Sequence, residues 1–171
     1  MNAATKNVGT GDRQRTVLRE LFGDRTPSRW VTRERPKIDR VACPWLILRF
    51  IDPRAEFIYV PTNRVFATAK ERDAIAFDIP GAPFSHVDEK CSFDAFIERF
   101  SIEDAGVLAL ALIVRGADTD QHDLAPEAAG LHALSLGFSL THQDDHAPPR
   151  ARSCRLRRAI RMGLPRPRRA S

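Results

Sequence analysis

The chain lacks any long apolar run, and its N-terminus lacks the apolar core of a secretory signal. No stretch of its 171 residues approaches the roughly 18 consecutive apolar residues that a membrane-spanning helix needs. The first twelve residues, MNAATKNVGTGD, are small or polar with few exceptions. We therefore expect a cytoplasmic protein without a membrane partner, and the length predicts one domain with a single core.

Cysteine is scarce as well. The three cysteines, Cys43, Cys91 and Cys154, form an odd number and show none of the paired spacings of a zinc ribbon or a disulfide framework. This absence predicts reduced thiols, any of which is a candidate for chemistry or for packing in the core.

Acidic residues are missing from 147–171, a segment that contains nine Arg. Removing these nine from the 27 basic residues of the chain leaves 18 basic against 22 acidic residues, so residues 1–146 carry a net charge of −4. A basic tail without interleaved aromatic residues binds polyanions nonspecifically and contains no motif that reads bases. Nucleic acid is therefore not the expected partner of this chain alone, and the oligomeric state stays open.

The Arg- and Pro-rich segment 148–171 predicts a basic, disordered tail. Its composition is also typical of GC-rich DNA read out of frame. Codons can be chosen for Pro149–Pro165 so that a one-base shift reads LEHGHAGYDALYAWAC, an amphipathic helix. A frameshifted C-terminus and a genuine basic tail are the two alternatives, and sequencing the coding DNA decides between them.

The apolar pattern predicts an α+β fold, with a small sheet of three or so short strands and a predominantly helical C-terminal half. Residues 1–29 are predicted to be a polar leader or linker with one amphipathic helix, and 30–147 to be the domain. Expected strands are Trp30–Thr32, Ala55–Val60 and Ile75–Ile79. Expected helices are Pro44–Ile51, Val65–Arg72, one along Phe93–Phe100, Asp104–Val114 ending at Gly116, and one starting at Pro126.

Cys43 is the candidate catalytic residue. Proline is favoured at the first position of a helix, so Pro44 predicts that Cys43 is the N-cap. The positive end of the helix, with Lys37 and Arg40 nearby, would favour the thiolate and would also bind an oxyanion. The alternative is that Cys43 is a small buried residue of the core.

His86, Glu89 and Asp118 are the candidate metal ligands. In an extended segment Glu89 and Cys91 share a face, whereas His86 needs a turn to join them. Asp118, on the loop expected after Gly116, is the best distant ligand. Oxygen and imidazole donors suit iron, manganese or zinc. The alternative is that His86 makes a hydrogen bond in a loop and that Cys91 belongs to the core.

Lys37, Arg40 and Arg115 are the candidate oxyanion-binding residues. The guanidinium group forms a rigid fork, so Arg40 and Arg115 together could clamp a tetrahedral oxyanion. The alternative for Arg115 is an ion pair with Asp39 or Asp118. The remaining histidines are expected to be solvated or on helix surfaces, because their spacing matches no ligand motif; they are His122, His132, His142 and His146.

Several ordered motifs resemble one family, the C-terminal domain of the chromate-resistance ChrB proteins, over about residues 30–147. They are WVTRERPKIDRVACPWLILRFIDP at 30–53, FDIPG at 77–81, SH at 85–86, Glu89, CSFDAF at 91–96, IVRGADT at 113–119, DLAPEAAGL at 123–131 and SLG at 135–137. Members are associated with bacterial chromate resistance and are described as chromate-responsive regulators or accessory proteins. Residues 1–29 are too few for the N-terminal domain that some members carry, so DNA binding that depends on it is not expected.

The resemblance implies a chromate-resistance accessory or chromate-sensing domain. Chromate is a tetrahedral dianion and a strong oxidant, so the three cations would supply charge and Cys43 or Cys91 would supply redox chemistry or sensing. Two alternatives stay open. One is a metal-dependent redox enzyme, with iron or manganese, that reduces chromate or dismutates superoxide. The other is an inactive truncated relic.

Overall fold

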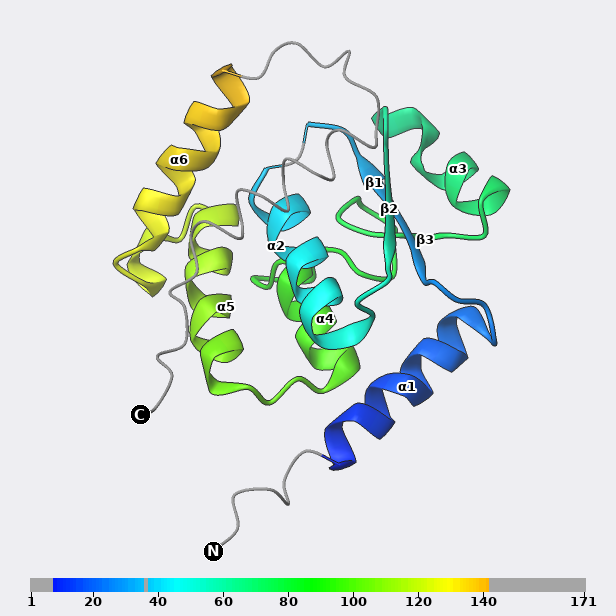
Figure 1. Cartoon of the computed structure of the whole chain (residues 1–171). Coiled ribbons are helices and arrows are strands. Elements are labelled where there is room, and N and C mark those ends of the chain that lie inside the picture. The colour runs from blue at the N-terminus through cyan, green and yellow to red at the C-terminus, as the bar shows by residue number, and fades with distance from the viewer. Residues whose placement is uncertain (1–7, 36, 142–171) are drawn as a thin grey trace, which may run out of the picture. The chain divides into compact units, whose positions relative to one another are not determined.

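Residues 8–35 and 37–141 are described by a computed structural model of the chain (Figure 1). The predicted tail from residue 148, with its frameshift alternative, lies outside these residues. The elements in chain order are α1 (Val8–Phe22), β1 (Arg29–Arg33), α2 (Ile38–Leu46), β2 (Glu56–Val60), α3 (Val65–Glu71), β3 (Ile75–Ala76), α4 (Ser92–Phe100), α5 (Ala105–Asp118) and α6 (Ala128–Thr141). A π-helical turn, Ile47–Ile51, continues α2, and single turns of 3-10 helix lie at Thr62–Arg64 and His122–Leu124.

The three strands form a parallel sheet in the order β2-β1-β3. Trp30 in the central strand lies opposite Phe57 on one side and Ile75 on the other. Helix α2 and the turn after it connect β1 to β2, and α3 connects β2 to β3, as parallel pairing requires. The predicted α+β fold, with its small sheet and helical C-terminal half, is confirmed.

The two faces of β1 pack into different parts of the core. Trp30 is fully buried and its ring makes edge contacts with Phe22, Phe84 and Phe96, at centroid distances of 5.2, 5.4 and 5.2 Å. The next residue, Val31, points the other way and packs with Val65 at the start of α3. Because side chains alternate along a strand, α3 covers one face and the larger helical layer covers the other.

Helix α2 begins earlier than the sequence predicts. It starts at Ile38 with Lys37 as its N-cap, and Pro44 lies inside it. An internal proline leaves the carbonyl of the residue four positions earlier without its helical partner. Here that carbonyl belongs to Arg40, and the Tyr59 hydroxyl of β2 donates to it at 3.4 Å. The predicted N-cap position of Cys43 is therefore wrong, since proline is tolerated inside this helix.

Helix α5 runs past Gly116 and ends at Asp118, so the predicted end at Gly116 is also wrong. Gly116 is needed for close packing instead. A Cβ at this position would lie 2.8 Å from the carbonyl oxygen of Gln121 and 2.9 Å from Cβ of Ala128. The glycine thus lets the following turn and α6 approach α5 closely, and the helix continues for two more residues to Asp118.

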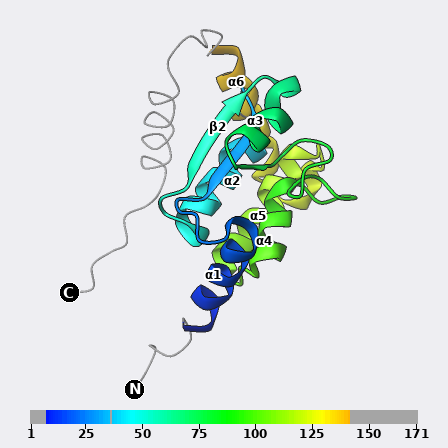
Figure 2. The same cartoon turned by 90° about the vertical axis from the view of Figure 1, so that its right-hand side faces the viewer.

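Helix α1 belongs to the same core as the residues after 30. Val17 and Phe22 are buried in the main apolar cluster, and Arg99 of α4 pairs with Glu20 of α1 at 2.7 Å. Both views place α1 and α6 at opposite ends of the part of the chain that the structure describes (Figures 1 and 2). The amphipathic helix expected within 1–29 is therefore present, and it packs against the domain.

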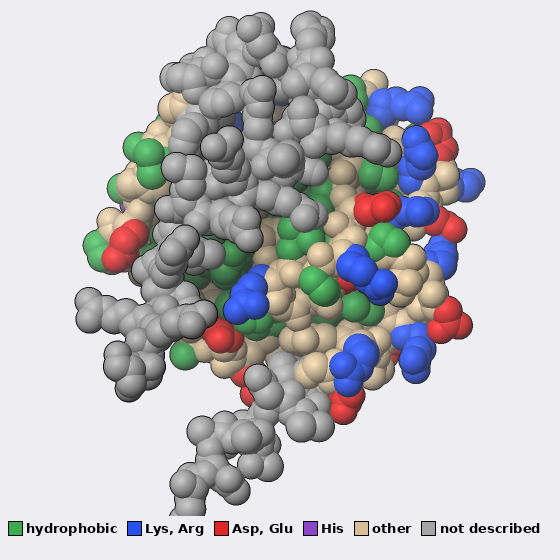
Figure 3. Space-filling view, in the orientation of Figure 1, with side chains coloured by type: hydrophobic (Ala, Val, Ile, Leu, Met, Phe, Trp, Pro, Cys, Tyr) green, Lys and Arg blue, Asp and Glu red, His purple; other side chains and the backbone are tan. Residues whose placement is uncertain are grey.

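The surface carries both signs of charge. On the face in Figure 3, Lys and Arg side chains lie next to Asp and Glu side chains. Pairs such as Arg29–Glu56 are about half exposed, and such pairs contribute only about 0–1 kcal/mol each. Stability therefore depends mainly on the aromatic core. No helix in the described ranges has the length and apolar character that crossing a membrane requires.

Candidate metal centre

Four side chains from distant parts of the chain converge at one point: Asp39, Asp78, His86 and Asp118. Each offers one ligand atom, and these atoms all lie within 4.8 Å of one another. Nε2 of His86 lies 3.0 Å from Asp118 Oδ2, 3.5 Å from Asp39 Oδ2 and 3.7 Å from Asp78 Oδ1. Three carboxylates around one imidazole form a ligand set for a cation.

The sheet topology explains why these residues meet. Asp39 is the second residue of α2, which follows β1, and Asp78 follows β3 by two positions. The carboxyl ends of parallel neighbours lie at the same edge of a sheet. From the central β1 the chain goes to β2 on one side and then crosses to β3 on the other, and such a reversal leaves a crevice where open α/β sheets bind ligands. Asp118, from the end of α5, and His86, from the loop before α4, complete the set.

Asp78 is anchored by cations. It has a positive φ of 51°, and its Oδ2 accepts hydrogen bonds from Arg40 at 2.7 Å and Arg33 at 3.2 Å. Ser92 Oγ donates to Oδ1 at 3.1 Å. Burial opposes ionisation, but the hydrogen bond with His86 and the charges of Arg40 and Arg33 lower the pKa of Asp78. It is therefore a carboxylate at neutral pH.

Asp39 is the most deeply buried of the four side chains, with 1% of its surface exposed. Its Oδ2 accepts the backbone N–H of Ser92 at 2.5 Å, whereas its Oδ1 has no hydrogen-bond partner among the described residues. Burial raises the pKa of Asp39, and the hydrogen bond with His86 opposes the shift. A buried carboxylate oxygen without a partner is costly, and a cation in the cluster would supply that partner.

His86 balances the negative charge of the cluster. Hydrogen bonds to Asp118, Asp39 and Asp78 raise the pKa of His86 to about 11, although burial opposes the shift. The protonated imidazole thus acts as the counter-ion of the three acids. A metal ion binds neutral imidazole, so it would replace this proton.

Two helix N-termini orient the acids. Ser92 is the first residue of α4, and its N–H points at Asp39. The N–H of Asp39, in the first turn of α2, donates to Oδ1 of Asp118 at 3.3 Å. Both contacts place a carboxylate at the positive end of a helix. Helix capping explains these two oxygens, but it leaves Asp39 Oδ1 and the convergence on His86 unexplained.

The third predicted ligand, Glu89, lies outside this cluster. It is exposed, in the turn between Val87 and Lys90, and it lines a neighbouring pocket of about 480 Å³. The pocket is lined by Ser85, Val87, Asp88, Glu89, Lys90, Cys91, Ala95, Glu98 and Arg115. Closeness in sequence therefore does not bring Glu89 to His86.

The predicted oxyanion-binding residues have different surroundings in the structure. Arg115 makes a two-pronged contact with Asp94, at 2.9 and 2.7 Å, and Arg40 pairs with Asp78. The acid that pairs with Arg115 is therefore neither Asp39 nor Asp118, the two expected in the alternative interpretation. Lys37 is exposed at the N-cap of α2. The two guanidinium groups pair with different carboxylates, and a shared oxyanion clamp stays a prediction.

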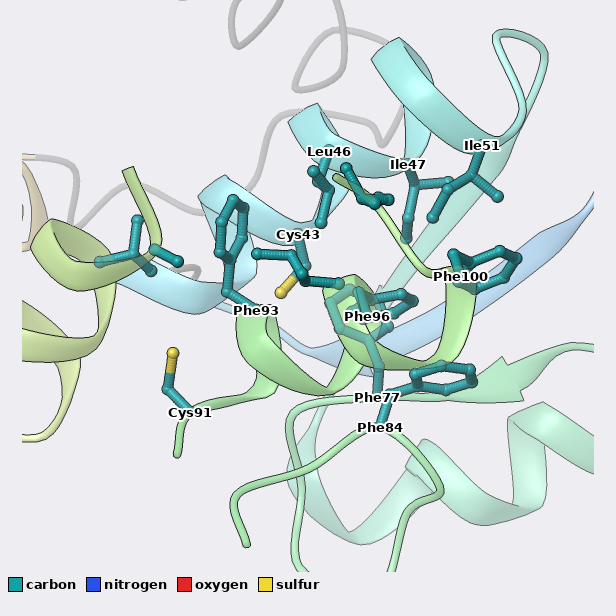
Figure 4. Packing of buried hydrophobic residues seen from close by; sticks show 14 of the residues in the cluster. Cys43, Leu46, Ile47, Ile51, Phe77, Phe84, Cys91, Phe93, Phe96 and Phe100 are labelled. Atoms are coloured by element: carbon teal, nitrogen blue, oxygen red, sulfur yellow. The ribbon is translucent and has the colours of Figure 1, made fainter. Parts of the chain in front are cut away.

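The thiols of Cys43 and Cys91 are buried. Cys43 lies in the second half of α2 next to Phe93 in the core and has no exposed surface (Figure 4). Burial raises the pKa of its thiol, contrary to the predicted activation, because the positive end of the helix is at Lys37. Burial raises the pKa of Cys91 as well, and its Sγ lies 3.4 Å from Asp94. A catalytic role for Cys43 stays a prediction without geometric support.

Asp39 and Asp78 are not among the ligands predicted from the sequence. A signal was present for each. Asp78 interrupts the apolar stretch IAFDI, and Asp39 precedes a run that reads as a buried helix. A lone acid in such a setting needs a partner, because burying an unpaired charge is expensive.

Comparison with known proteins identifies the family. The family model for the ChrB C-terminal domain matches residues 30–154. A curated relative, Protein ChrB of Cupriavidus metallidurans, is 38% identical over 109 residues, which cover 63% of this chain and 32% of the relative. The match thus spans about a third of the relative's length. No solved structure matches. The resemblance read from the motifs is therefore confirmed, and the chain belongs to the ChrB C-terminal domain family.

Proposed function

We propose that this chain is a chromate-resistance domain that works through one metal ion held by Asp39, Asp78, His86 and Asp118. The observation that carries the proposal is their convergence, with all ligand atoms within 4.8 Å of one another. In addition, Oδ1 of the buried Asp39 has no hydrogen-bond partner among the described residues. A family associated with chromate resistance supplies the biological setting.

The donor set favours manganese or iron. Three carboxylate oxygens and one imidazole form an oxygen-rich donor set that suits Mn²⁺ and Fe²⁺. Zinc more often binds nitrogen and sulfur donors. The bound ion would supply a positive charge and coordination positions for an anionic oxygen. The protein would fix the ligands through Ser92, Arg33 and Arg40, which hold the acids from behind.

The charge around the site favours an anionic ligand once a metal is present. Arg33 and Arg40 with a divalent cation place four positive charges against three carboxylates. The open side is at His86 and Asp118, whose side chains are 41% and 16% exposed. A tetrahedral oxyanion such as chromate would reach the ion from this side. Oxyanion binding would thus depend on the metal, since Arg40 and Arg115 are already paired with acids.

Metal and anion binding to the tag-free chain test this proposal. We expect elemental analysis to find one manganese or iron per chain, and calorimetry to show sulfate or chromate binding to the Mn²⁺-loaded protein alone. Asp118→Asn should weaken Mn²⁺ binding at least tenfold, whereas Asp24→Asn, at an exposed acid away from the site, should not. Absence of metal binding would contradict the proposal and favour the relic. Anion binding without metal that Arg115→Ala abolishes would favour the direct clamp.

A metal-dependent redox enzyme acting on chromate or superoxide is the second candidate function. The donor set favours it, because the two metals that fit best both change oxidation state. The test is the loss of superoxide, or of chromate in the presence of an added thiol reductant, with metal-loaded wild type and Asp118→Asn. Equal rates in the two proteins would remove this candidate.

A further inference from the structure

A second group of metal-type ligands lies just beyond α5. Nε2 of His122 is 3.3 Å from Nδ1 of His132 and 3.3 Å from Oδ1 of Asp120, and the last two atoms are 4.0 Å apart. The described residues contain two such groups, this one and the cluster around His86. We propose that Asp120, His122 and His132 form a second metal site, which takes a zinc-like divalent cation.

The three atoms have the spacing that one ion requires. A triangle with these sides has its centre about 2.1 Å from each corner, which is the length of a bond from zinc to imidazole nitrogen or carboxylate oxygen. An ion can therefore sit among the three atoms without any of them moving far. The nitrogens of the two rings are also too close together, at 3.3 Å, for a water molecule to lie between them.

Hydrogen bonding alone satisfies this group poorly. Nδ1 of His132 faces the carbonyl oxygen of Ala117 at 3.1 Å, as well as His122 and Asp120. A ring nitrogen carries at most one hydrogen, so it can donate well to one of these three neighbours. A cation attracts all the lone pairs at once, and the Ala117 carbonyl is a further oxygen beside the site.

The turn after α5 and the packing of α6 against α5 bring these three residues together. Asp120 has a positive φ of 60°, which turns the chain back after α5 and brings His122 under α6. Gly116 permits α6 to approach closely enough for His132, one turn after Ala128, to reach the turn. The site therefore depends on the same close packing that sets the end of α5.

The two sites should prefer different ions. Two imidazoles and one carboxylate suit Zn²⁺, Ni²⁺ or Cu²⁺, whereas the oxygen-rich first cluster suits manganese or iron. The side chains of His122, His132 and Asp120 are 37%, 30% and 81% exposed, so an ion can enter and leave from solvent. Solvent would fill the remaining coordination positions.

The test is Zn²⁺ binding to the tag-free full chain by calorimetry, with Cu²⁺ spectra as a second readout. We expect wild type to bind one Zn²⁺ per chain at this site. His122→Gln and His132→Gln should each lower the affinity for that ion at least tenfold. This affinity should be unchanged by Asp118→Asn and by the control His142→Gln/His146→Gln. The paramagnetic resonance spectrum of bound Cu²⁺ should show two nitrogen ligands in wild type and one in His132→Gln.

Retained Mn²⁺ binding in the two single histidine variants will show that they are folded and that the first site does not need either histidine as a ligand. Zinc binding that survives both variants, or that only the control double variant removes, would overturn the second site. So would wild-type protein that binds no zinc, because the two rings would then be a hydrogen-bonded pair alone.

Discussion

Arg115 donates from two nitrogens to both oxygens of Asp94, so the last turns of α5 are fastened to the first turn of α4. Asp94 is 4% exposed and also accepts the backbone N–H of Cys91. The hydrogen bonds to Asp94 raise the pKa of Arg115, although burial opposes the shift. A residue that the sequence marks for oxyanion binding is thereby a structural contact between two helices.

Arg115→Ala should therefore lower stability. The change leaves the buried Asp94 carboxylate without its main partner, and the expected loss in the free energy of unfolding is about 3 kcal/mol. Arg99→Ala breaks an exposed pair with Glu20 and should cost less than about 1 kcal/mol. Urea unfolding measures both values, and equal losses would contradict the structural role.

Gly116→Ala should destabilise the chain by about 1–3 kcal/mol through overpacking against Gln121 and Ala128. Gly130→Ala in α6 is the matched control, because nothing lies within 4 Å of the added Cβ and alanine favours a helix by about 1 kcal/mol. Thermal melts should move in opposite directions for the two variants. A neutral Gly116→Ala would mean that the turn after α5 adjusts freely.

Tyr59→Phe should cost about 1 kcal/mol of folding free energy, because the carbonyl of Arg40 loses the hydroxyl that replaces its helical bond. Adding Pro44→Ala restores an N–H that can bond this carbonyl. The cost of Tyr59→Phe should then be smaller in the Pro44→Ala background than in wild type. Urea unfolding of the four proteins gives the coupling, and additive effects would show that the hydroxyl serves another purpose.

The Asp52–Ser28 contact should make stability depend on pH. The N–H and hydroxyl of Ser28 bond Asp52 at 2.8 and 2.7 Å, and the N–H of Arg54 bonds it at 2.9 Å. Burial opposes ionisation, but these bonds prevail and lower the pKa of Asp52. A lowered folded-state pKa gives stabilisation that is complete above the unfolded pKa of about 3.9 and is lost as the pH falls through the folded value.

The measurement is the difference in unfolding free energy between wild type and Asp52→Asn across pH. It should be level at about 1–2 kcal/mol from neutral pH to about pH 5 and should shrink below about pH 4. A difference that grows as the solution becomes more acidic would show that the contact favours the protonated acid.

Thiol labelling tests the burial of Cys43. Because the side chain has no exposed surface and burial raises the pKa of its thiol, iodoacetamide should modify it only after unfolding. Peptide mapping of native and urea-treated protein gives the extent of modification at each cysteine. Rapid labelling of Cys43 in the native protein would contradict its burial and would support the activated thiol that the sequence predicts.

Local patterns predicted most elements correctly. Phe93, Phe96, Ile97 and Phe100 lie on one helical face and pack in the core as expected, and the three strand regions are present. The start of α2 could not be predicted, because the tolerance of Pro44 depends on Tyr59 from another strand. Local rules describe a proline's own helix and not the distant side chain that compensates for it.

The candidate site was predictable only in part. Residue type alone points to His86 and Asp118 as ligands, and they lie 3.0 Å apart. Asp39 and Asp78 are not predictable from spacing, because their meeting depends on the strand order and on the reversal after β1. Nearness to His86 in sequence points to Glu89 as well, but the turn at Val87–Lys90 directs Glu89 to the neighbouring pocket. Ligand sets of this kind follow from topology rather than from spacing.

Asp118 ends α5, and Asp120 follows two positions later in the same turn. An ion at either cluster would restrain the backbone that presents the acid of the other. Thermodynamic reciprocity then requires that any change in manganese affinity caused by zinc be matched by an equal change in zinc affinity caused by manganese. Any such coupling would pass through Thr119, which alone separates the two acids in the chain.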